Sequence, residues 1–90
     1  MEDKNILDIL KTDLQISVDS MDSYLLNIIQ LSKDSIEKEG ITLQENSVSD
    51  GMLVEMYAAY LYRQRKEDKP MPRYLRWNMN NRLLGQKAGK

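Results

Sequence analysis

Met52–Leu84 reads MLVEMYAAYLYRQRKEDKPMPRYLRWNMNNRLL, and this stretch decides the fold. At 100° per residue, the apolar residues of Met52–Tyr62 fall on every side of a helix, with Glu55 as the one interruption. A basic segment and two prolines, Pro70 and Pro72, then lead into a second helix. A helix that is apolar all round has to be covered on all sides. In so short a chain we expect the other helices to cover one side and a second copy of the protein to cover the other.

The helix after the prolines has two apolar stripes. Leu75, Met79 and Leu83 fall on one side of the helical wheel, and Trp77 and Leu84 fall on the other. A helix with two apolar sides requires two packing partners. This second helix therefore also predicts a contact beyond the subunit's own core.

The remaining sequence predicts two more helices, so we expect an all-α fold: a small bundle of about four helices with short connections. The expected helices span about Lys4–Lys11, ended by Thr12-Asp13; Ser20–Glu39, apolar on one side; Val48–Lys66; and a fourth from Pro70 or Pro72 to Gly85. Residues 1–90 form one domain, in which residues 85–90 are predicted to be a flexible, solvated tail.

Local signals fix two of these boundaries. Gly40 follows a long amphipathic segment at the position of a left-handed helix C-cap. The segment Ser47–Asp50 fits a capping box, which predicts that the next helix begins near Val48.

Composition argues against an enzyme. The 90-residue chain has no Cys and no His, which removes thiol nucleophiles, disulfides, the common zinc ligands and the usual general base. No nucleophile–base spacing or phosphate-binding glycine motif is present, so we predict no catalytic, cofactor-binding or metal-binding residues. No apolar run has the length of a signal peptide or a membrane span, so we expect a soluble protein with no membrane contact.

Charge is distributed unevenly along the chain. Residues 1–55 contain 4 Lys and 12 acidic residues, whereas residues 56–90 contain 9 basic and 2 acidic residues. Three explanations remain open: a basic arm for nucleic acid, pairing between the two halves within a subunit or between neighbours, and ordinary solvated helix faces.

Several segments carry a resemblance to a known family. They are Ala58–Arg65 (AAYLYRQR), Met71–Arg76 (MPRYLR), Asn80–Leu83 (NNRL), Leu10–Leu14 (LKTDL) and Asp22–Ile29 (DSYLLNII). Together they resemble the small head-tail connector, or adaptor, proteins of tailed bacteriophages, which are also described as DNA-packaging proteins. The resemblance extends over about residues 6–87 and is carried by structural rather than catalytic motifs.

The resemblance implies a structural role without catalysis. Members of this family form an oligomeric ring under the portal at the capsid vertex, extend the DNA channel and present a platform to the next neck protein. The implied partners are other copies of the chain, the portal protein and the next neck or tail-completion protein, and DNA passes through without sequence-specific contact. The implied location is the virion neck, with assembly in the cytoplasm of the bacterial host.

Three tyrosines of the first apolar helix are candidate interface residues. Tyr57, Tyr60 and Tyr62 each combine a large apolar ring with a polar hydroxyl group, which suits a partly solvated protein–protein contact. We predict that at least one of them lies in an interface; the alternative is that all three line the core of the subunit.

The basic residues around the proline turn are the other candidates. Arg63, Arg65, Arg73 and Arg76 are predicted to contact a protein partner, with Arg73 and Arg76 favoured because they lie in the MPRYLR motif. Trp77 is also predicted to lie in the protein interface, and we expect its indole to be a buried anchor rather than a cation–π partner of these arginines. A second hypothesis, a small helical DNA-binding module, would use this same basic half, including Lys66, Lys69 and Arg82, on phosphates.

Overall fold

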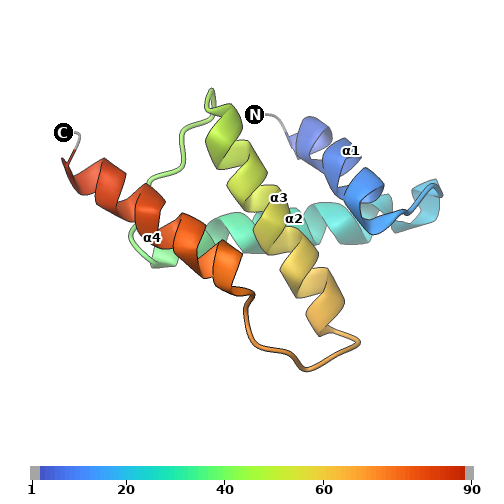
Figure 1. The fold of residues 1–90 in the computed structure, drawn as a ribbon. Helices are drawn as coiled ribbons and strands as arrows, with labels where there is room; N and C mark the ends of the chain where they lie inside the picture. The colour runs from blue at the N-terminus through green and yellow to red at the C-terminus, as the bar shows by residue number, and fades with distance from the viewer. Residues whose placement is uncertain (1–2, 89–90) are drawn as a thin grey trace.

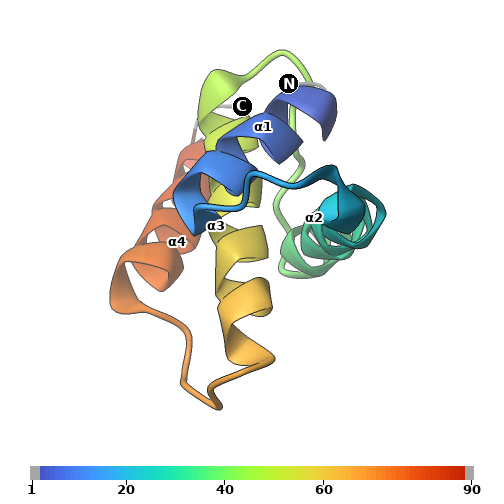
Figure 2. The ribbon, with the colours of Figure 1, turned by 90° about the vertical axis from the view of Figure 1, so that its right-hand side faces the viewer.

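The computed structural model of the protein describes residues 3–88, which form four α-helices and one short 3₁₀-helix. The α-helices are α1 (Asp3–Leu14), α2 (Asp22–Lys38), α3 (Val48–Gln64) and α4 (Arg73–Ala88), and the 3₁₀-helix η1 (Asp19–Met21) immediately precedes α2. α3 lies in the middle of the bundle, between α1 and α4 (Figure 1). A view turned by 90° shows α2 against α3 on the side away from α4 (Figure 2). The prediction of an all-α bundle is confirmed.

α3 is covered by its own chain on more than one side. α1 and α2 pack against one side and α4 packs against another, and the residues buried by these contacts include Leu53, Val54, Ala58 and Ala59. Two apolar residues at the beginning of the helix, Val48 and Met52, stay exposed. The expectation that the other helices leave a whole side of this helix open is therefore wrong for most of its length.

α2 is amphipathic, as predicted. The side facing α1 and α3 buries Leu25, Ile28, Ile29, Ser32 and Ile36. Ser32 is tolerated in the core because its hydroxyl donates a hydrogen bond of 2.7 Å to the Ile28 carbonyl, so the Ser32 hydroxyl is not left unsatisfied. From α1, the core receives Ile6, Leu7 and Leu10.

Three predicted helix boundaries are confirmed by backbone geometry. Gly40 follows α2 with φ of +101°, a left-handed conformation that glycine adopts without the steric cost of a Cβ atom. The Ser47 hydroxyl accepts a hydrogen bond of 3.1 Å from the Asp50 amide and so caps the beginning of α3. Pro72 directly precedes α4, and its carbonyl accepts hydrogen bonds from the amides of Leu75 and Arg76.

The predicted end of the first helix is wrong. Thr12 and Asp13 do not break α1, which continues to Leu14. The Thr12 hydroxyl turns back to the Asp8 carbonyl at 3.0 Å, which satisfies it inside the helix. The residue after the helix, Gln15, has a φ of 58°, which places it in the left-handed region and ends α1 at Leu14.

The predicted end of the last helix is also wrong. Gly85 does not close α4, which continues to Ala88, so residues 85–88 are helical rather than a flexible tail. The reason is that the Gln86 side chain is held by hydrogen bonds to the Gly40 carbonyl and the Thr42 amide. Residues 89–90 of the predicted tail lie outside the described residues.

Candidate assembly interface

α4 has one buried side and one exposed side. Leu75 and Met79 are 0% and 1% exposed, whereas Trp77 and Leu84 on the opposite side are 67% and 64% exposed. Leu83 is half-buried against the core, beside the other two residues of its stripe. The predicted arrangement of two apolar stripes is confirmed. The expectation that the Trp77 indole is buried is wrong for the single chain, because no other part of residues 3–88 covers that side of α4.

The exposed stripe has the spacing of a helix–helix contact. Its members lie alternately three and four residues apart along α4 and are all exposed: Tyr74, Trp77, Asn81, Leu84 and Ala88. We call these five residues the outer face of α4. A repeat of this kind keeps apolar side chains on one line of a helix, where a second helix packs against them. Apart from the polar Asn81, the outer face is therefore an apolar surface, and no other helix among residues 3–88 covers it.

The charged residues of α4 are all basic. Arg73, Arg76 and Lys87 lie beside the outer face and are exposed, and the helix contains no acidic residue. Arg76 also makes an exposed ion pair of 3.2 Å with Glu39 at the end of α2. The outer face of α4 thus has an apolar centre and a basic rim.

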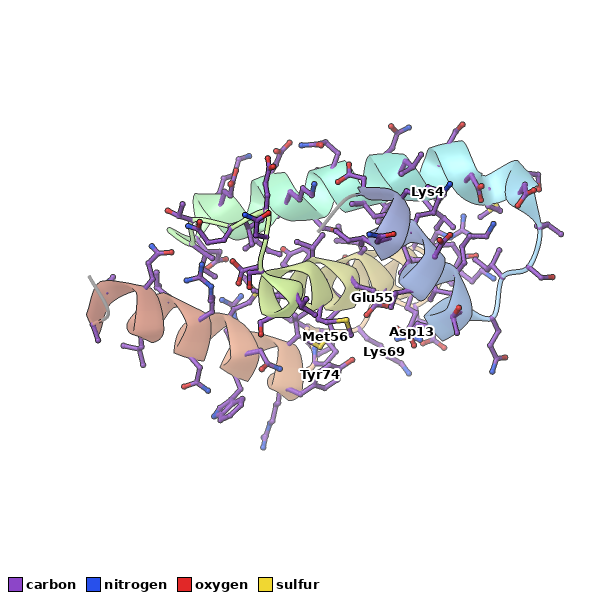
Figure 3. The ribbon with its side chains drawn as sticks, turned by 90° about the horizontal axis from the view of Figure 1, so that it is seen from above. Lys4, Asp13, Glu55, Met56, Lys69 and Tyr74 are labelled. Carbon is purple, nitrogen blue, oxygen red and sulfur yellow. The ribbon has the colours of Figure 1, made fainter. Side chains whose placement is uncertain are left out.

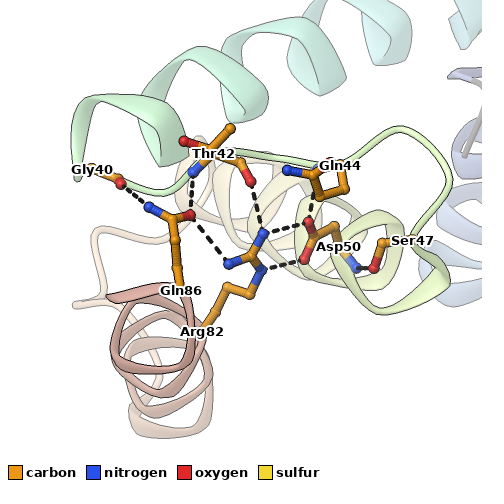
Figure 4. Close-up of polar contacts among 7 residues, drawn as sticks. All are labelled: Gly40, Thr42, Gln44, Ser47, Asp50, Arg82 and Gln86. Atoms are coloured by element: carbon orange, nitrogen blue, oxygen red, sulfur yellow. Dashed lines mark hydrogen bonds and ion pairs between the residues drawn. The ribbon is translucent and has the colours of Figure 1, made fainter. Parts of the chain in front are cut away.

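A buried ion pair fixes the position of α4. Arg82 donates from Nε to Asp50 Oδ1 at 2.6 Å and from Nη2 to Asp50 Oδ2 at 2.9 Å, and Nη2 also donates to the Thr42 carbonyl at 2.7 Å (Figure 4). Gln86 completes the arrangement by bonding Arg82, Thr42 and Gly40. We call this network the Arg82–Asp50 clamp. It joins α4 to the beginning of α3 and to the connection after α2.

The clamp keeps its carboxylate ionised. Burial alone would raise the pKa of Asp50, but hydrogen bonds from Arg82 and from the Gln44 amide outweigh burial and lower that pKa below its usual value. The same contact with Asp50 raises the pKa of Arg82. The pair is therefore charged throughout the neutral pH range, with two parallel hydrogen bonds that a lysine could not reproduce.

A second surface, a shallow groove, lies between α1 and α3. Its lining residues are Asp8, Ile9, Thr12 and Asp13 from α1, and Met52 and Glu55 from α3. We call it the acidic groove, because its three ionisable residues are all carboxylic acids. Figure 3 shows Asp13 and Glu55 where α1 lies beside α3.

Glu55 is the unusual group of the acidic groove. Its side chain is 3% exposed, and no N–H or O–H donor among residues 3–88 reaches Oε2. Burial, and next the hydrogen bond and the charge of Asp13, raise the pKa of Glu55 to about 8, whereas the charge of Arg63 lowers it. Two carboxyl groups in contact need a proton between them. Glu55 is consequently protonated at neutral pH.

The structure divides the predicted interface residues among separate places. Tyr57 and Tyr60 are half-buried and pack edge to face, with ring centroids 5.8 Å apart. Arg65 lies over the half-buried ring of Tyr62 at 4.3 Å and over the ring of Tyr24 at 5.3 Å. The aromatic partners of an arginine are therefore on α3 and α2, not at Trp77.

The other predicted residues lie at the end of α3 and along α4. Arg63 and Tyr60 line a depression together with Pro70, Pro72 and Tyr74, among others. Arg73, Arg76 and Trp77 are exposed on α4; Trp77 belongs to its outer face, and the two arginines lie beside that face. The tyrosines and the α4 residues therefore do not form one continuous predicted site.

Basic residues of the second half pair with acidic residues of the first half inside one subunit. Arg63 approaches Asp13 at 3.5 Å, and the pairs Arg76–Glu39 and Arg82–Asp50 follow along α4. Part of the uneven charge distribution is thus explained by the chain folding back on itself.

Sequence reasoning missed two features of these surfaces. In the sequence, Glu55 is only an interruption in an apolar helix, and no local pattern predicts that its side chain is buried beside Asp13. Asp50 was expected only as part of a cap, and Gln86 as part of a tail, yet both hold α4 in place.

Residues 3–88 offer neither a metal site nor a membrane-spanning helix. No group of three or more His, Cys, Asp or Glu residues is placed to bind a metal ion there. In the same part of the chain, no helix combines the length and the hydrophobicity needed to cross a membrane. Comparisons of the sequence and structure with protein-family models, curated proteins and solved structures found no match.

Proposed function

We propose that this protein is a non-catalytic structural subunit that assembles with copies of itself. The observation that carries this proposal is the division of α4 into two sides. Leu75 and Met79 are buried in the subunit's core, while Trp77 and Leu84 remain exposed on the opposite side of the same helix. Exposed aromatic and aliphatic side chains gathered on one helix face are typical of protein–protein contacts.

Within this class, the proposed role is that of a head-tail connector of a tailed bacteriophage. The support is the resemblance of segments such as Met71–Arg76 and Asn80–Leu83 to that family, together with a surface that needs a protein partner. In this role the subunits form a ring under the portal, extend the DNA channel, and support DNA packaging, head completion and tail attachment. The site of action is then the virion neck, after assembly in the host cytoplasm.

The charges favour this role over the alternative of a DNA-binding module. Arg63, Arg76 and Arg82 are each engaged by a carboxylate of the same chain, which leaves fewer cations for phosphate contacts. Among the large hydrophobic residues of α4, Trp77 and Leu84 are the most exposed, and they offer no charge to a DNA backbone. A gel-shift assay with duplex DNA at low salt separates the two roles, because the connector role predicts no shift.

The test is the native mass of the purified full chain, measured by size exclusion with light scattering over a range of protein and salt concentrations. The expected result is a discrete large oligomer that negative-stain electron microscopy resolves as closed rings with a central channel. A monomer under every condition, combined with a strong DNA shift, would contradict the connector role and support the DNA-binding module.

A further inference from the structure

We infer that the outer face of α4 in one copy of the protein packs into the acidic groove between α1 and α3 of a neighbouring copy. The inference rests on the self-assembly proposed above and names the two surfaces that form the contact. Neither surface includes a residue of the other.

The two surfaces are complementary in charge. The outer face of α4 is apolar at Trp77 and Leu84, and its flanking charges are all positive. The acidic groove has an apolar part, including Ile9 and the exposed Met52, and its ionisable lining residues are all acids. Joining these surfaces buries apolar side chains on both and places opposite charges at the rim, which favours this pairing and its register.

The acids of the groove differ in accessibility: Glu55 is buried, whereas Asp8 and Asp13 are exposed. The nearly buried carboxyl group of Glu55 lines the groove, and Oε2 receives no N–H or O–H donor from residues 3–88. The charged groups around it are Asp13 on α1, which contacts it, and Arg63 on α3, which pairs with Asp13 from the exposed side. A guanidinium from a neighbouring α4 therefore meets the exposed carboxylates of Asp8 and Asp13 at the edge of the groove, where it can form charge-assisted hydrogen bonds.

Pairing of two α4 helices with each other is the competing arrangement, and charge argues against it. With four basic residues and no acidic residue, two α4 helices side by side would bring Arg73, Arg76 and Lys87 close to like charges. Like charges across an interface disfavour association. The acidic groove offers the opposite charge on the same chain.

The proposed contact has a geometric consequence. A contact between two different surfaces of identical subunits is heterologous, and repeating it produces either a closed ring or an open filament. A contact of α4 with itself would instead stop at a dimer. The inferred pair of surfaces therefore supplies the kind of contact that a ring requires.

Mixing two variants tests the inference directly. The face variant, W77S/L84S, removes the apolar centre of the outer face, and the groove variant, D8K/M52K, reverses charge and places a cation in the groove. All four positions are exposed, so both variants should keep the fold, which far-UV circular dichroism checks. Leu31→Ser is the matched control, because Leu31 is 55% exposed on α2, outside both surfaces.

The inference predicts that each variant alone is a 10.5 kDa monomer by light scattering and that an equimolar mixture doubles this mass. The mixture stops at a pair, because it contains one intact face and one intact groove. The L31S control should assemble as the wild type does. If the wild type forms rings and the groove variant does too, the acidic groove is not the acceptor, and the inference fails while the connector role stands. If the wild type itself is monomeric throughout, the inference fails, and a strong shift of duplex DNA by that monomer would overturn the connector role as well.

Discussion

Arg82 and Asp50 lie 32 residues apart in sequence and form two parallel hydrogen bonds of 2.6 and 2.9 Å. The Asp50 side chain is 4% exposed and that of Arg82 is 24% exposed, so the pair is mostly removed from water. This contact sets where α4 sits, and therefore which of its sides faces outward.

The first prediction concerns this ion pair. Arg82→Ala should lower the free energy of unfolding by about 2–4 kcal/mol, because it leaves a buried carboxylate without its partner. Arg82→Lys should restore only part of the loss, since an ammonium group cannot form the two parallel bonds. Urea unfolding followed by circular dichroism measures both. Arg73→Ala is the control: Arg73 is exposed, and a change within about 0.5 kcal/mol is expected.

The second prediction concerns pH and Glu55. The pKa of Glu55 is raised in the folded chain to about 8, above its ordinary value of 4.5, so the folded state holds this proton more tightly than the unfolded state. The contribution to stability is complete below about pH 4.5 and is lost as pH rises through about 8. At about 1.4 kcal/mol for each pKa unit, we expect the free energy of unfolding to fall by up to about 5 kcal/mol across this window.

Glu55→Gln isolates that effect. The amide has nearly the same shape but does not ionise, so the unfolding free energy of E55Q should depend much less on pH between about 5 and 8. Chemical denaturation at a series of pH values gives the comparison. An E55Q curve that falls as steeply as the wild-type curve would assign the pH dependence to another group.

The third prediction compares the two sides of α4. Leu75→Ala removes a fully buried side chain and should cost about 2–4 kcal/mol through lost burial and the cavity that remains. Leu84→Ala removes the same atoms from an exposed position, and in dilute, monomeric protein it should change stability by less than about 0.5 kcal/mol. Equal losses in thermal or chemical unfolding would show that both sides are packed within one subunit.

The fourth prediction uses Trp77, the one tryptophan of the chain, as a probe. The indole is 67% exposed in the single chain, so its fluorescence should be that of a solvated tryptophan at low protein concentration. As concentration rises and subunits associate, the emission should move to shorter wavelength, because the outer face of α4 leaves water. Constant emission across a transition in mass would place Trp77 outside the interface.

Much of the fold could be predicted because its signals are local. The long apolar side of α2, the glycine at position 40 and the cap at Ser47 each depend on residues close in sequence. The two stripes of α4 were also visible, because helical periodicity alone separates Leu75 from Trp77.

The errors have a common physical origin in contacts between distant residues. Gly85 predicts a helix end, but the Gln86 side chain is hydrogen-bonded to the carbonyl of Gly40, 46 residues earlier, and the helix continues to Ala88. Gln15 ends α1 in a left-handed conformation without being the glycine or asparagine that usually marks such a position. The depth at which Glu55 lies depends on how α1 approaches α3, which no local pattern specifies.

The two-sided construction of α4 separates two kinds of evolutionary constraint. Substitutions at Leu75, Met79 or Arg82 affect folding first, because these residues hold the bundle together. Substitutions at Trp77 or Leu84 leave the core unchanged and affect only the contact with a partner surface. The outer side of this helix is therefore free to change in step with a partner while the subunit beneath it stays the same.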